Sequence, residues 1–252
     1  MSGLRIASRS LRRLWTRVTM NPVWATVIAA LIISGVSTAV KFLDPLSLLD
    51  HGEAVAALPG PSWGPARQVY DCDRHAFCGG GDHVSFDSTL HNPIYDDERY
   101  FLSGKVEGEV GGVQDLIRVE PGDVVQLRMF VANDGDPNIP HPRPLLARGL
   151  EARLELPQDP ASLVRIVGWL TARNAYPAQV FDSVTLEGGE PFLVHLVGGS
   201  VELQNRAHAK GIPLPDSIVE RPTPLGYRRL DGMLDTCFCH AGNVMAKVVI
   251  GG

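Results

Sequence analysis

The sequence predicts an all-β chain in which a single N-terminal transmembrane helix precedes an antiparallel β-sandwich. Three observations support this fold class. An uncharged apolar segment of about 20 residues lies near the N-terminus. Short alternating segments recur through the rest of the chain, and Gly or Pro separates nearly all of them. No convincing amphipathic helix of about ten or more residues follows the apolar segment.

The first 41 residues predict a membrane anchor. Residues 1–20 form a basic tail without an acidic residue, and 21–41 are expected to form the transmembrane helix. A helix rises about 1.5 Å per residue, so about 20 residues cross a hydrocarbon core about 30 Å thick. Because basic residues favour the cytoplasmic side, we expect the tail inside the cell and the rest of the chain outside. The residues behind this topology are Arg5, Arg9, Arg12, Arg13 and Arg17.

A cleaved signal peptide is the main alternative to the anchor. Ser37 and Ala39 give a small-x-small pattern after the apolar run. We favour the uncleaved anchor, because a signal-peptide core is usually about 7–15 residues long. Both interpretations export the rest of the chain, either as a cell-membrane protein or as a secreted one.

The exported part divides into a linker at 42–70, with a Pro/Gly-rich centre, and a domain at 71–252. Within the domain, "LEARLELP" alternates apolar and charged residues with a period of two, as a half-buried strand requires. Similar runs are present elsewhere. The expected strands are 124–132, 150–156, 164–171, 180–186, 192–197, 201–205 and 244–250.

The stretch "IRVEPGDVVQLRMFVANDG" reads as a short strand, a turn and a second, alternating strand. In the turn, Pro121 pre-sets φ, Gly122 permits a positive φ, and Asp123 can accept a backbone hydrogen bond. This pattern, together with "FDSTLHNPIYDDERYFLSGKV" before it and "LGYRRLDGMLDTCFCHAG" after it, resembles an immunoglobulin-like domain of exported or membrane-anchored actinobacterial surface proteins. The resemblance covers 84–250. It implies an immunoglobulin-like sandwich outside the cell and no catalytic residues.

Four cysteines lie in two distant groups, Cys72 with Cys78 and Cys237 with Cys239. An exported domain lies where disulfides persist, and an even number of cysteines favours two of them. Since a Cys237–Cys239 bond would close a very small ring, we expect each of these residues to bond to Cys72 or Cys78. The first such bond would stabilise the fold by about 4–5 kcal/mol. A metal site and a redox or free-thiol role are the alternatives.

Other reactive residue types have structural interpretations. The chain contains no G-x-S-x-G motif, and His195 alternates with apolar neighbours as a sheet residue does. The acidic run "YDDERY" includes Arg99, so we expect an ion pair or a turn cap there rather than a general acid and base. The loop "DCDRHAFCGGGD" fails the EF-hand pattern because Ala76 stands where glycine is required.

These observations predict a non-enzymatic, membrane-anchored extracellular interaction or cell-envelope structural module, with no cofactor. The expected partners are the membrane and an unidentified protein or cell-wall ligand. The net charge of −5 gives no reason to expect nucleic acid. The alternative is an exported metal-binding or hydrolytic domain with a site near His75, His83 and His240.

Overall fold

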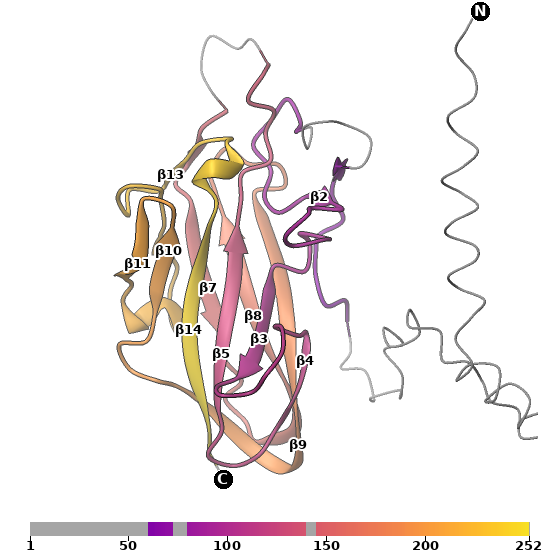
Figure 1. The fold of residues 1–252 in the computed structure, drawn as a ribbon, viewed down its shortest axis with the longest axis vertical. Coiled ribbons are helices and arrows are strands. Elements are labelled where there is room, and N and C mark those ends of the chain that lie inside the picture. Colours follow the sequence, from indigo (N-terminus) through magenta and orange to yellow (C-terminus); the bar gives the residue numbers. More distant parts are fainter. Residues whose placement is uncertain (1–59, 73–79, 140–144, 252) are drawn as a thin grey trace, which may run out of the picture. The chain divides into compact units, whose positions relative to one another are not determined.

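A computed structural model describes residues 60–72, 80–139 and 145–251, all of which belong to one compact unit, 56–252. The unit is all-β and mostly antiparallel, as predicted, and its strands form a two-sheet, sandwich-like fold (Figure 1). Helix within the described residues amounts to two short 3-10 turns, η3 (Asp216–Val219) and η4 (Phe238–His240), and to the 3-10 conformation of Cys72.

The first sheet carries the candidate site described below. Its central strand, β14, pairs with β5 along one side, and with β10 and the end of β9 along the other. The strands of this sheet run in the order β11 (His208–Pro213), β10 (Glu202–Asn205), β14 (Gly242–Gly251), β5 (Val124–Val131) and β3 (Leu102–Val106).

The second sheet packs behind the first. Its strands are antiparallel except for β4, which runs parallel to β9. They run in the order β12 (Thr223–Pro224), β7 (Glu151–Glu155), β8 (Ala161–Thr171), β9 (Gln179–Leu196) and β4 (Leu116–Val119). Two smaller pairings accompany the sheets: β1 (Tyr70–Asp71) with β2 (Thr89–Leu90), and β6 (Ala147–Arg148) with β13 (Met233–Leu234).

The core lies between the two sheets because the inward side chains alternate along the strands. On β14 every second residue from Val244 to Ile250 is buried, and on β8 Val164, Ile166 and Leu170 are buried. This period of two is what a strand with one face in the core requires. The predicted strands at 124–132, 150–156, 164–171, 201–205 and 244–250 are confirmed as β5, β7, β8, β10 and β14.

The prediction of separate strands at 180–186 and 192–197 is wrong, because both belong to the 18-residue strand β9. Gly188 and Gly189 lie between these two runs, and we expected them to separate two strands as Gly or Pro does elsewhere. Instead the chain stays extended there, since β4 pairs alongside it as far as Val119 opposite Gly188. β9 pairs with β8 of the second sheet as far as Phe192 and with β14 from Leu193 onward, so a single strand connects the two sheets.

The Pro121–Asp123 turn connects β4 to β5. Gly122 has a φ of +94°, a conformation that favours glycine. Its N–H donates to Ile250 O at 2.8 Å, which attaches the turn to the end of β14. Asp123 caps the turn by accepting the Glu120 N–H through Oδ2 at 2.8 Å.

The described part of the predicted linker lies along the second sheet. Gly64 exchanges two backbone hydrogen bonds with Phe181 of β9, at 2.9 and 2.7 Å, and Ser183 Oγ donates to Ser62 O at 2.8 Å. The guanidinium of Arg67 donates to Asp87 O at 2.7 Å. Residues 60–70 are therefore bound to the domain surface rather than acting as a free spacer.

The tail at 1–20 and the predicted transmembrane helix at 21–41 lie outside the described residues. Within the part of the chain that the structure describes, no helix has both the length and the apolar character needed to cross a membrane.

Candidate functional site

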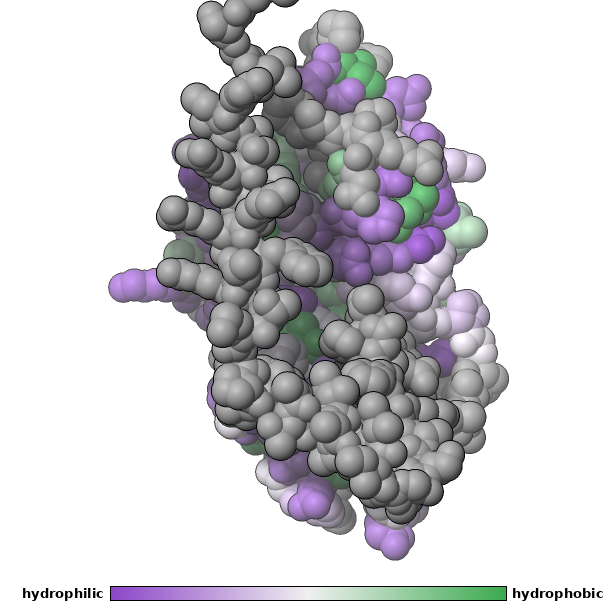
Figure 2. Space-filling model, turned by 45° about the vertical axis from the view of Figure 1, so that its right-hand side comes forward, coloured by the Kyte–Doolittle hydropathy of each residue, from purple (hydrophilic) through white to green (hydrophobic). Residues whose placement is uncertain are grey.

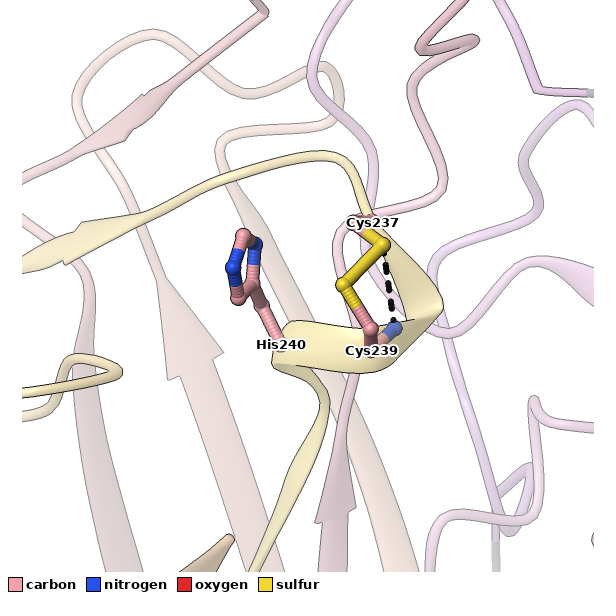
Figure 3. Close-up of side chains that lie close together, drawn as sticks. All are labelled: Cys237, Cys239 and His240. Carbon is pink, nitrogen blue, oxygen red and sulfur yellow. Dashed lines mark hydrogen bonds between the residues drawn. A yellow bond between two sulfur atoms is a disulfide. The ribbon is translucent and has the colours of Figure 1, made fainter. Parts of the chain in front are cut away.

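The turn η4 lies between β13 and β14, where it brings two sulfur atoms and an imidazole together (Figure 3). Cys237 caps the turn, and its sulfur accepts the Cys239 N–H at 3.3 Å. The ligand atoms of Cys237, Cys239 and His240 all lie within 4.8 Å of one another. Among the described residues, this is the only group of three His, Cys, Asp or Glu side chains close enough to share a metal ion.

The expected disulfides between the two cysteine groups are wrong, because the structure bonds Cys237 to Cys239. The helical turn places their Cα atoms 5.0 Å apart, inside the range of about 4.4–6.8 Å that a disulfide spans. We expected the short separation to prevent this bond. Cys72 is also disulfide-bonded, but Cys78 lies outside the described residues.

The change in connectivity lowers the expected contribution of Cys237 and Cys239 to stability. In the chain-entropy model a bond that closes a three-residue loop contributes about 1.5 kcal/mol, far less than a bond across most of the domain. We therefore expect Cys237→Ser/Cys239→Ser to lower the free energy of unfolding by no more than about 2 kcal/mol. Urea denaturation of the natural and variant chains measures this. A loss of about 4 kcal/mol or more would contradict it and would favour bonds to Cys72 and Cys78.

His240 is held against the domain on one side. Its ring packs on Tyr227, with the ring centroids 4.3 Å apart. Its Nδ1 is buried and has no hydrogen-bond partner among the described residues. A buried nitrogen without a hydrogen-bond partner is costly, and this one belongs to a side chain that lies beside two sulfur atoms.

A groove of about 300 Å³ lies next to η4 on the outer face of the first sheet. We call it the outer-face groove and define it by six of its lining residues. Three neighbouring strands contribute the row Gln204, Asn243 and Phe130, which the strand register places side by side. The six residues are Tyr95, Phe130, Gln204, Arg206, Phe238 and Asn243.

Aromatic rings form one wall of the outer-face groove. Tyr95 stacks on Phe130 with the centroids 3.8 Å apart, and Phe238 lies 6.1 Å from Phe130. Phe238 is 50% exposed, and the neighbouring Ile94 is 69% exposed. Asn243 Oδ1 is buried and has no hydrogen-bond partner among the described residues. The groove therefore offers apolar contact area, and one of its lining residues carries a buried acceptor without a hydrogen-bond partner among the described residues.

Large exposed apolar side chains are otherwise scattered over the described surface. On the face drawn in Figure 2, most of the coloured surface is hydrophilic, and hydrophobic side chains appear only in small patches. Ile94 and Phe238, both exposed, lie at one groove beside the partly buried Tyr95, and this grouping differs from the background. Exposed apolar groups gathered in a hollow are typical of binding surfaces.

A cluster of acidic side chains lies where the segment before β3 meets the end of β5. Asp87 is fully buried and accepts the Ala132 N–H through Oδ1 at 2.8 Å, while Asp134 accepts the Ser88 N–H. Burial, followed by the charges of Asp134 and Asp87, raises the pKa of Glu98 to about 10. Burial likewise raises the pKa of Asp134 to about 6 and that of Asp87 well above its ordinary value.

One cation faces this acidic group. Arg67 donates to Ser88 Oγ at 3.1 Å and lies near the charges of Asp87 and Asp134. Burial lowers the pKa of Arg67, although both carboxylates oppose this effect. We interpret the cluster as a structural element that holds Arg67 and the segment 87–98 against the end of β5. Asp134 comes from the loop "NDGDPN", and the sequence did not show that this acid would be buried.

Of the three histidines in the predicted metal or hydrolytic site, the structure describes His83 and His240, and these two do not share one ligand group. His240 belongs to the η4 group, whereas His83 pairs through Nδ1 with Asp82 at 3.0 Å and packs edge-on against Tyr176. His75 lies outside the described residues, as do the five topology arginines. His195 lies in β9 as predicted.

The expected ion pair in "YDDERY" is confirmed. Arg99 Nη2 lies 2.6 Å from Asp97 Oδ2, and Arg99 Nε also donates to the same carboxylate. Asp96 adopts a φ of +58° in the same turn. The neighbouring Glu98 points the other way, into the buried cluster, and is 1% exposed. The run is therefore split between a partly exposed ion pair and a buried acid.

Comparison with known proteins does not identify the chain: it matches no protein-family model, no curated protein and no solved structure.

Proposed function

We propose that the chain is a non-enzymatic, single-pass membrane protein whose β-sandwich lies outside the cell and binds a partner protein through the outer-face groove. The basic tail and the apolar segment at 21–41 support the anchored topology. The antiparallel two-sheet architecture and the Pro121–Asp123 turn between β4 and β5 are compatible with an immunoglobulin-like sandwich. The proposal that it belongs to an actinobacterial surface protein rests on the resemblance of the sequence segments alone.

The observation that carries this proposal is the exposure of Ile94 and Phe238 at the outer-face groove. Interfaces are enriched in aromatic and Arg side chains at their centre, and a few such residues supply most of the binding free energy. Tyr95, Phe238 and Arg206 are of these types. Burying Phe238 in a complex would remove apolar surface from water, which a monomer in isolation leaves exposed.

The charges around the groove define the partner further. Arg206 lines it, and none of its lining residues is acidic. The guanidinium of Arg128 lies 5.2 Å from the centroid of the Tyr95 ring, next to the same wall. We therefore propose that the groove receives an apolar or aromatic side chain of the partner, with an Asp or Glu nearby to pair with Arg206.

Site-specific photocrosslinking in cells tests this function. A photoreactive p-benzoylphenylalanine is placed at Ile94 or at Phe238 of the full-length chain, and the crosslinked products are identified by mass spectrometry. We expect a discrete adduct with one protein, joined through a segment that contains an apolar residue and a carboxylate. Arg206→Glu should reduce the adduct by about tenfold, because a repulsive charge replaces an attractive one.

Tyr176 provides the matched control position, since it is 76% exposed and does not line the groove. The photoreactive group at Tyr176 should not give the same adduct. Equal adducts from all three positions, or no adduct from Ile94 and Phe238, would contradict a specific partner at the groove.

A further inference from the structure

We propose that η4 is a redox-gated site for a thiophilic d10 cation, Zn(II) or Cu(I), which Cys237, Cys239 and His240 bind once their disulfide is reduced. This inference does not depend on the proposed partner protein. It rests on the geometry of the turn and on the chemistry of the three side chains.

The three ligand atoms are already close enough for a metal centre. They lie within 4.8 Å of one another, and all three residues belong to the 3-10 turn η4 or to its N-cap. In a tetrahedral zinc site, with Zn–S about 2.3 Å and Zn–N about 2.0 Å, the ligand atoms are about 3.5–3.8 Å apart. Figure 3 shows the imidazole beside the two sulfur atoms. Small side-chain rotations after reduction would therefore complete the site.

The environment of the turn favours ligation by the reduced side chains. The Cys239 N–H already points at the Cys237 sulfur, and a backbone donor to sulfur stabilises a thiolate. Tyr227 packs against the His240 ring and restricts its orientation. The buried Nδ1 of His240 has no hydrogen-bond partner among the described residues, so no hydrogen bond there competes with a metal ion for this nitrogen.

Reduction of the Cys237–Cys239 disulfide by a dithiol converts the closed state of the site into the metal-binding state. A protein or small-molecule dithiol attacks the disulfide and is itself oxidised to a disulfide, while Cys237 and Cys239 gain two electrons and become thiols. Binding of the cation then releases one proton from each thiol to the solvent. Both cysteines are half-buried and the bond closes a three-residue loop, so the disulfide is accessible to a reductant and gains little chain-entropy stabilisation.

The donor set selects the class of cation. Two thiolates and one imidazole are soft or borderline ligands, which suit Zn(II) and Cu(I) and disfavour Ca(II) and Mg(II). Zinc with three protein ligands keeps one position for water or for a further ligand, whereas Cu(I) accepts three ligands without a fourth.

Metal titration of the full-length chain in detergent tests the proposal. The protein is reduced with a water-soluble phosphine under anaerobic conditions, and Zn(II) or Cu(I) is added in competition with a chromophoric chelator. We expect Cys237→Ser/Cys239→Ser to bind one ion fewer per chain than the natural sequence. We expect His240→Gln to weaken binding by at least about tenfold, because one of three protein ligands is lost. Before reduction the natural chain should not bind at this site.

A control variant and a spectroscopic probe distinguish metal binding at η4 from metal binding at other residues. His83→Gln removes a histidine outside the η4 group and should leave the affinity unchanged. Substitution of Co(II) should give the absorption of a tetrahedral site with thiolate ligands in the reduced natural chain, and this absorption should be absent from Cys237→Ser/Cys239→Ser. The proposal is overturned if this double variant binds as many ions as the natural chain, if His240→Gln binds with unchanged affinity, or if the oxidised chain binds equally well.

Discussion

Glu98→Gln is expected to make the domain more stable at neutral and alkaline pH and to flatten the pH dependence of its stability. The Glu98 side chain is buried, and its pKa is raised to about 10 by burial and by the charges of Asp134 and Asp87. Between its ordinary pKa and about pH 10, folded Glu98 therefore keeps a proton that the unfolded chain has lost. The stability that depends on neutral Glu98 is fully present below the ordinary pKa of a Glu side chain. It is lost as the pH rises through the pKa of Glu98 in the folded chain.

One retained proton gives a slope of about 1.4 kcal/mol per pH unit. Glutamine copies the neutral acid: its carbonyl can accept the Asn92 amide as Glu98 does, and it cannot ionise. Urea denaturation at several pH values from 5 to 8 should show the natural chain losing stability faster than Glu98→Gln by about this slope. Glu109→Gln, at an exposed position, is the control. Parallel curves for the natural chain and Glu98→Gln would contradict the prediction.

Asp182→Ala is expected to lower the free energy of unfolding by about 2–4 kcal/mol. Asp182 lies on β9 and is 0% exposed, and its Oδ2 accepts the Leu102 N–H of β3 at 2.7 Å. This hydrogen bond joins the two sheets across the core. Alanine would leave the buried Leu102 N–H without this acceptor and would open a cavity. Denaturation at pH 6 measures the effect.

Asp182→Asn is the matched variant, because its amide oxygen can still accept the Leu102 N–H. Burial raises the pKa of Asp182 to about 8, so the natural side chain is mostly neutral at pH 6, as asparagine is. We expect Asp182→Asn to remain within about 1 kcal/mol of the natural chain at pH 6. Equal losses for the alanine and asparagine variants would show that the hydrogen bond between the sheets is not what Asp182 contributes.

The strands with one buried face were predictable from the sequence, because their side chains alternate. Along β14 and β7 buried and less buried residues alternate strictly, and both strands were found within two residues of their ends. By contrast, β3 has four buried residues out of five, and β11 has none, so neither has an alternating pattern to detect. Burial on both faces, or on neither, removes the period of two.

Two errors came from treating local chemistry as decisive. Gly188 and Gly189 were expected to separate two strands, but pairing with β4 and then with β14 keeps β9 extended. Cys237 and Cys239 were considered too close in sequence to bond, but the 3-10 turn brings them together. Strand pairing therefore determined the conformation of Gly188 and Gly189. A local turn determined which cysteines bond.

The outer-face groove and the buried acids were beyond the reach of sequence patterns. Tyr95 and Phe130 are 35 positions apart and stack only because a loop folds over β5. Glu98 and Asp134 likewise approach each other only in the folded chain. The residues of η4 are the exception. Cys237, Cys239 and His240 are contiguous enough for the sequence to mark them as candidates, although it did not show which pairing they adopt.

Labelling of intact cells with a membrane-impermeant, amine-reactive reagent tests the central claim most directly. The tail at 1–20 contains no lysine, whereas the domain contains Lys105, Lys210 and Lys247, so labelled peptides report the side of the membrane on which the domain lies. We predict that peptides containing Lys105 and Lys210 are labelled in intact cells and that the labelled chain stays in the membrane fraction. Labelling of these peptides only after the cells are permeabilised would contradict an extracellular interaction module.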